Sequence, residues 1–144
     1  MKKLILLLFF VSINLSFSQE KTTLTDSLTK RFNKLWDSND ISAMVSMIQP
    51  TAFFESPYQL RYGRDTMEIT VLKTNPPVYK DVKSTEKYSH VESNIAWSLG
   101  NLSANIYDEN GKKTGKILNS SYTFVFTREG GKEWKLQMMI LFDK

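Results

Sequence analysis

One segment of the sequence gathers side chains that could do chemistry. It reads FFESPYQLRYGRD, residues 53–65, and holds a carboxylate, a hydroxyl and a phenol at Glu55, Ser56 and Tyr58. Such groups can transfer protons when a pKa lies near neutrality, or they can bind the polar end of a ligand. Because side chains alternate between the faces of a strand, Phe54 and Ser56 would face one side and Glu55 the other. We therefore expect Glu55 to be solvated or paired with a nearby arginine; its use as an interior base would require a bulge.

The other reactive residue types are scarce. His90 is the only histidine and there is no cysteine, so thiolate metal sites, disulfides and a cysteine nucleophile are excluded. Metal sites usually draw on several converging ligands, and none converge in this sequence. Gly130-Gly131 reads as a hairpin turn rather than a phosphate-binding loop. We expect His90 to be a surface residue near a turn, and we expect no metal and no cofactor.

The first 18 residues have the pattern of a secretory signal peptide. Lys2 and Lys3 precede the apolar run LILLLFFV, and Ser16 and Ser18 suit a cleavage site. The run is too short for a membrane anchor, which needs about 20 apolar residues. We expect residues 1–18 to be removed, and residues 19–144 to form one soluble domain that is periplasmic or secreted.

The charge balance of the chain argues against nucleic acid as a partner. The chain has 19 basic and 15 acidic residues, and two of the basic ones lie in the predicted leader. The remaining charges nearly balance, whereas nucleic-acid binding proteins carry a basic surface. We expect no nucleic-acid partner and no membrane anchor.

Apolar spacing predicts three helices near the N-terminus. Two stretches have helical periodicity, around Leu24–Trp36 and Ile41–Ile48, with Asp40 as an N-cap and Pro50 after the second. A third helix is predicted over residues 65–73, after Gly63.

The remainder reads as an antiparallel meander. Strands are predicted over about 51–55, 79–90, 92–107, 115–128 and a last stretch in which Trp134, Leu136, Met138, Ile140 and Phe142 share one face. The apolar alternation shifts from odd to even positions at Gly100-Asn101, which predicts a β-bulge and a bent sheet. Three helices on one face of this sheet give an α+β fold, a strongly curved, antiparallel-rich sheet in the shape of a cone.

Four segments carry a family resemblance: FNKLWDSNDISAMVSMI, AFFESPYQLRYGRD, NIAWSLG and YTFVFTREGGKEWKLQMMI. Together with the order of elements, they resemble the nuclear transport factor 2-like superfamily, which includes the SnoaL-like cyclases and the ketosteroid isomerases. The resemblance extends from about Leu24 to Phe142. It implies the cone-shaped fold, but this fold serves many functions.

The isomerases place a tyrosine, a protonated aspartic acid and an aspartate base in their site. The resemblance puts these positions at Phe32, Tyr122 and Ser56. Phe32 has no donor and Ser56 is a poor base, although Tyr122 can still donate a hydrogen bond. We therefore expect no ketosteroid isomerase activity, and we assign no catalytic residue.

A stripe of aromatic and polar residues could line the interior of the cone. The predicted pocket consists of Phe32, Trp36, Phe54, Ser56, Tyr58, Tyr122, Phe124 and Met138. Ligand pockets are mostly apolar with a few placed polar groups. The same residues could instead form a filled core, with Trp36 as the plug.

Three functions remain open from the sequence. The favoured one is an exported, non-enzymatic domain that holds a small apolar or amphipathic molecule. The others are an enzyme of the cyclase, dehydratase or isomerase kind with an atypical set such as Tyr58, Tyr122 and Glu55, and a filled interaction module. A homodimer through the outer sheet face, with Thr123, Val125 and Thr127, is also expected.

Overall fold

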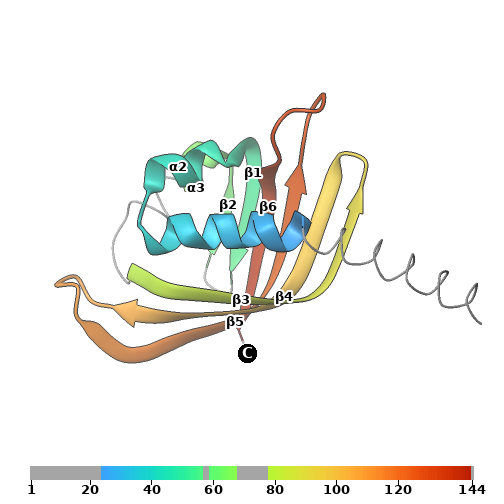
Figure 1. Cartoon of the computed structure of the whole chain (residues 1–144). Helices are drawn as coiled ribbons and strands as arrows, with labels where there is room; N and C mark the ends of the chain where they lie inside the picture. Colours follow the sequence, from blue (N-terminus) through green and yellow to red (C-terminus); the bar gives the residue numbers. More distant parts are fainter. Residues whose placement is uncertain (1–23, 57–58, 68–77, 144) are drawn as a thin grey trace, which may run out of the picture.

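Helices cover one side of a six-stranded sheet in the computed structural model, which describes residues 24–56, 59–67 and 78–143 (Figure 1). The predicted leader and Tyr58 lie outside these residues. In chain order the elements are a first helix over residues 24–37, α2 (Ile41–Ser46), β1 (Ile48–Ser56), β2 (Gln59–Tyr62), α3 (Arg64–Met67), β3 (Val78–Glu92), β4 (Ile95–Tyr107), β5 (Lys113–Thr127) and β6 (Lys135–Asp143).

The sheet has the strand order β2-β1-β6-β5-β4-β3. Strands β3 to β6 form the predicted antiparallel meander, and β1 lies parallel to β6. The sequence did not indicate β2, which pairs with β1. The α+β fold class is confirmed: long strands β3, β4 and β5 bend beneath the helices, and the sheet stays open (Figure 1).

Two helix boundaries differ from the prediction. The second helix ends at Ser46 rather than Ile48, and Pro50 lies within β1, where the pairing with β6 is irregular. Asp40 caps this helix as expected, because its side chain accepts a hydrogen bond from the Ala43 backbone at 3.0 Å. The third helix is described over Arg64–Met67, and the rest of its predicted range lies outside the described residues.

The predicted bulge in β4 is wrong. Even-numbered residues of β4 remain buried from Ala96 to Ala104, so no change of phase occurs at Gly100. Strand β4 also pairs with β5 without a register shift through this region. The apolar odd positions before Gly100 misled the prediction because the outer face of the sheet is apolar there.

Register shifts occur instead in β3 and β6, for which the sequence predicts regular strands. In β3 the register shifts between Lys80 and Lys83 and again between Glu86 and Tyr88. In β6 it shifts beside Phe126, so the buried positions change phase along that strand. Each extra residue increases the local bend, which suits a sheet that curves around the first helix.

The core lies between the first helix, α2 and the inner sheet face. Phe32 and Met44 from the helices are fully buried, and so are Phe124 and Phe126 from the predicted inner face of β5. The even residues of β5 therefore face inward as the alternation of the sequence predicts.

Candidate functional site

Five of the predicted pocket residues come together on the inner side of the sheet. Phe32, Phe54, Tyr122 and Phe124 are buried, and Trp36 is half-buried beside them. The Phe32 ring lies 5.9 Å from Phe124 and 6.1 Å from Trp36 in edge contacts, and Tyr122 lies 4.7 Å from Phe124, centroid to centroid. These rings form a packed aromatic wall.

The other three predicted residues lie elsewhere. Ser56 is half-buried at the end of β1, and Tyr58 is outside the described residues. Met138 is on the outer face, opposite Val125 and Phe53, because the register shift in β6 turns it away from the core. Its assignment to the interior is corrected here: Met139 and Leu141 are the buried residues of this part of β6.

Glu55 and His90 lie away from the interior. Glu55 is exposed and pairs with Leu60 and Ile140 on the outer face. His90 lies in β3 rather than in a turn, with half of its side chain exposed, 3.6 Å from Glu92. Among the described residues, no group of three or more His, Cys, Asp or Glu could hold a metal ion.

A polar seam runs beneath the first helix, and the sequence analysis missed it. Thr25, Thr29 and Asn33 occur four residues apart, so they share one face of the helix, and all three are buried. They meet polar residues of the sheet. We define the polar seam as these three residues together with Ser84, Glu86, Ser98 and Tyr122.

Two contacts join the helix side of the polar seam to the sheet. Asn33 donates from Nδ2 to the Ser84 hydroxyl at 2.9 Å. The hydroxyls of Thr29 and Ser98 lie 3.4 Å apart, and Ser98 is fully buried. The signal for this seam was present in the sequence as a Thr-Thr-Asn spacing beside the apolar stripe of the first helix.

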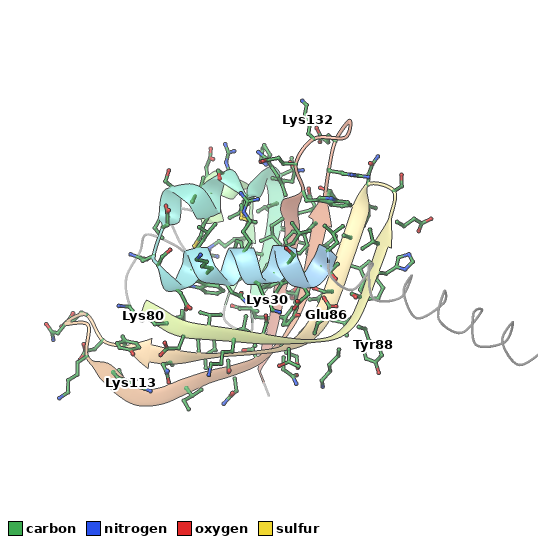
Figure 2. All side chains as sticks on the ribbon, in the orientation of Figure 1. Lys30, Lys80, Glu86, Tyr88, Lys113 and Lys132 are labelled. Atoms are coloured by element: carbon green, nitrogen blue, oxygen red, sulfur yellow. The ribbon has the colours of Figure 1, made fainter. Side chains whose placement is uncertain are left out.

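Glu86 and Tyr122 lie in one cross-strand row, on either side of Gly100. Glu86 pairs with Gly100 in the β3–β4 ladder, and Gly100 pairs with Tyr122 in the β4–β5 ladder. Paired residues share a face, so both side chains point toward the first helix. Figure 2 shows Glu86 between β3 and the start of the described part of the first helix, with Tyr88 on the other side of the sheet.

Gly100 is required by this row. A Cβ atom at this position would lie 2.1 Å from the Thr85 carbonyl oxygen and 3.0 Å from Tyr122 Cε1. The Tyr122 ring thus covers the glycine, and the strand β3 backbone approaches it from the other side. Any side chain here would separate Glu86 from Tyr122.

Four oxygen atoms of the polar seam are buried and accept or donate no hydrogen bond among the described residues. They are Asn33 Oδ1, both carboxylate oxygens of Glu86, and the Tyr122 hydroxyl. Buried polar groups are normally satisfied, and an unsatisfied one costs about 1–3 kcal/mol. Four such atoms in one seam leave it open to hydrogen bonds from water or from a ligand.

The buried surroundings of the Tyr122 hydroxyl raise its pKa. Burial raises its pKa above the ordinary value, and the negative charges of Glu86 and Asp26 raise it further. The nearby hydroxyls of Ser98 and Thr29 lower the pKa, but neither forms a well-oriented hydrogen bond with Tyr122, so burial dominates. The Tyr122 hydroxyl therefore stays protonated and can donate.

A groove borders one end of the polar seam. It has a volume of about 450 Å³ and lies between the first helix and edge strand β3. Its lining includes Asn33 and Ser84 of the seam; the other lining residues are Lys30, Lys34, Asp37, Val82, Lys83 and Thr85. The groove therefore borders the Asn33 and Ser84 end of the polar seam, where Asn33 Oδ1 is buried.

The outer face of the sheet is a second candidate surface. Six large apolar residues are exposed in the described part of the chain, and all of them lie on this face: Leu60, Tyr62, Tyr88, Ile95, Ile117 and Phe142. On the same face, the adjacent strands β4, β5 and β6 have nine neighbouring positions without a charged side chain. They are Trp97, Leu99, Asn101, Ser121, Thr123, Val125, Met138, Ile140 and Phe142. We call these nine residues the central strip.

No helix among the described residues is both long enough and apolar enough to span a bilayer.

Comparison with known proteins finds solved structures of similar fold, but no matching family model and no matching curated sequence.

Solved structures of the same architecture are numerous. A nuclear transport factor 2-like superfamily protein from Salmonella enterica serovar Typhimurium has a TM-score of 0.67 at 14% identity, covering 87% of this chain and 91% of its own. A ketosteroid isomerase-like protein from Erwinia carotovora atroseptica has a TM-score of 0.63 at 12% identity, covering 83% and 93%. A conserved protein from Planctomyces limnophilus has a TM-score of 0.69 at 15% identity, covering 84% and 94%. At these identities the likeness is one of fold.

Proposed function

We propose that this chain, which has the nuclear transport factor 2-like fold, binds a small amphipathic molecule along its polar seam. The observation that carries the proposal is the set of four buried, unpartnered oxygen atoms on Asn33, Glu86 and Tyr122. Tyr122 lies beside the aromatic wall, and Asn33 lines a groove that reaches solvent. Apolar walls with a few placed polar groups are the usual composition of a ligand site.

The energetics favour an occupant for this seam. Each buried oxygen without a partner costs about 1–3 kcal/mol relative to a satisfied one. A ligand that supplies the missing hydrogen bonds removes this cost and gains charge-assisted bonds at Glu86. The seam thus resembles a site preorganised for binding more than a core optimised for stability.

Binding is proposed in preference to ketosteroid isomerisation. At the position of the isomerases' helix tyrosine, Phe32 is fully buried and offers no donor. Ser56, at the position of the base, is the last residue of β1 and is half-buried. Its hydroxyl does not ionise near neutral pH.

A ligand screen by thermal shift tests this function. Lipids, sterols and aromatic metabolites would be added to the purified chain, since binding to the folded state raises the apparent melting temperature. We expect at least one class to stabilise the chain, and Tyr122→Phe to reduce the effect. Tyr88→Phe, on the outer face, is the matched control. No stabilisation by any class would contradict the proposal.

We also propose that two copies pair through the outer sheet face. The central strip is uncharged and flanked by exposed apolar residues, which is typical of interfaces rather than of solvated surfaces. A strip centred on β5 and its two neighbours can meet its own copy about a twofold axis. Glu55 and His90 lie at its margins, where charge is tolerated.

Export is part of the proposed function. The basic start, short apolar run and serines of residues 1–18 support cleavage after Ser18. Mass spectrometry of chain recovered from the periplasm or medium tests it, with Gln19 expected as the first residue. Retention of an uncleaved chain in the cell would contradict it.

A further inference from the structure

The remaining hydrogen-bonding capacity of the polar seam is mostly acceptor capacity. Asn33 already uses its amide nitrogen on Ser84, which leaves the Asn33 carbonyl oxygen. Glu86 adds two carboxylate oxygens, and an ionised carboxylate can only accept. The hydroxyls of Thr29, Ser98 and Tyr122 can accept as well as donate. A ligand group that fits this arrangement must bring donors.

Glu86 also forms no ion pair with another described residue. The ion pairs between described residues join Lys30 to Asp26, Arg64 to Asp65 and His90 to Glu92, and none includes Glu86. Three groove lysines, Lys30, Lys34 and Lys83, are each adjacent in sequence to a seam residue, and Lys30 is bound to Asp26 at 2.6 Å. Removing a carboxylate from water without a cation is costly, so this position favours a positively charged partner.

The hydrogen-bonding groups around Glu86 suit a protonated amine. An ammonium group carries three donors in a small volume, and the seam offers the Glu86 oxygens with the hydroxyls of Tyr122 and Ser98 at the same end. The buried rings of Phe124 and Phe32 lie beyond Tyr122, with centroid distances of 4.7 Å between Tyr122 and Phe124 and 5.9 Å between Phe32 and Phe124. Aromatic faces add cation–π attraction for a desolvated amine and contact for an apolar body.

We infer that the ligand of the polar seam is an amine with an apolar or aromatic body, whose ammonium group bonds the Glu86 carboxylate. This inference rests on the proposed binding function and adds a ligand class to it. It excludes carboxylates and phosphates as the group that enters the seam, because their oxygens would face the oxygens of Glu86 and Asn33.

Three probes of the same aromatic body separate the alternatives. We would titrate the purified chain with 2-phenylethylamine, 2-phenylethanol and 3-phenylpropanoate and measure dissociation constants by calorimetry. We expect the amine to bind about 10- to 100-fold more tightly than the alcohol, the range of a charge-assisted hydrogen bond. We expect no binding of the carboxylate. This comparison uses the unchanged chain and needs no variant.

Variants then assign the effect to Glu86. Glu86→Gln keeps the shape and removes the charge, so it should abolish the preference for the amine while leaving the affinity for the alcohol. Glu133→Gln, in the exposed β5–β6 hairpin, should leave both affinities unchanged. Should Glu86→Gln fail to fold by circular dichroism, Glu86→Asp retains the charge and should retain the preference.

The outcomes distinguish the two proposals. Equal affinity for amine and alcohol, or an amine preference that survives in Glu86→Gln, overturns the amine inference and leaves the binding function standing. Tighter binding of the carboxylate also overturns it. Failure of all three probes overturns the inference, whereas the binding function falls only if the wider ligand screen fails too.

Discussion

Asp37 accepts a hydrogen bond from the backbone nitrogen of Val82 at 2.7 Å, and this contact ties the end of the first helix to edge strand β3. The nitrogen is available because β3 is irregular between Lys80 and Lys83. Asp81, within the irregularity, has a φ of 55° and accepts from the Asn105 amide at 2.6 Å. The irregular part of β3 thus forms hydrogen bonds with both the first helix and strand β4, beside the groove.

The first prediction concerns this tie. Asp37→Ala leaves the Val82 nitrogen without its partner, which should lower the free energy of unfolding by about 1–3 kcal/mol, measured by urea denaturation. Asp37→Asn keeps an acceptor oxygen and should lose less. Equal stability of Asp37→Ala and the unchanged chain would show that the contact contributes nothing.

The second prediction concerns Gly100. In Gly100→Ala the new methyl group would lie 2.1 Å from a backbone oxygen that cannot rotate away, so strand β3 must move. We expect a loss of about 3 kcal/mol or more in the free energy of unfolding, the upper range for overpacking. Ser103→Ala, on the outer face of the same strand, is the control and should change stability little. A stable Gly100→Ala would mean that β3 lies farther from β4 than described.

The sequence predicted those features that depend on local alternation. The inward direction of Tyr122, Phe124 and Phe126 follows from a period of two, and the helical spacing placed Phe32 in the core. The fold class followed from the order of such elements. These features need no knowledge of which strand lies next to which.

Features that depend on strand neighbours were missed. The parallel pairing of β1 with β6 and the register shift in β6 are set by distant partners, so Met138 was placed on the wrong face. Glu86 lies in the polar run KSTEKYSH, yet both of its carboxylate oxygens are buried. A polar residue buried by a distant element gives no local signal in the sequence.

The third prediction is a pH dependence from Tyr122. Its pKa is raised in the folded chain, so above about pH 10 the unfolded chain releases this proton while the folded chain keeps it. Stability from this group is therefore complete below the unfolded pKa and is lost as pH rises toward the folded pKa. Tyr122→Phe should lose less stability than the unchanged chain between about pH 9 and 11 in urea titrations. Tyr88→Phe should follow the unchanged chain.

The same variant separates a ligand site from a structural hydrogen bond. Since the Tyr122 hydroxyl has no hydrogen-bond partner among the described residues, its removal at neutral pH should leave the ligand-free chain equally or more stable. A loss of more than about 1 kcal/mol would show that the hydroxyl has a structural partner and would weaken the case for a site.

The fourth prediction concerns the outer sheet face. Leu99 lies in the central strip between Thr123 and Tyr88 and is only half-buried, so the single chain can accept a polar side chain there. In a dimer the two strips would face each other, and Leu99→Arg would bury a charge without a partner beside its own symmetry copy. We expect the mass in solution, measured by light scattering after gel filtration, to fall from that of a dimer to that of a single chain. Lys132→Glu, in the hairpin that extends beyond the sheet in Figure 2, should leave the dimer intact. A single-chain mass for the unchanged protein across micromolar concentrations would refute the pairing and leave the apolar strip to another partner.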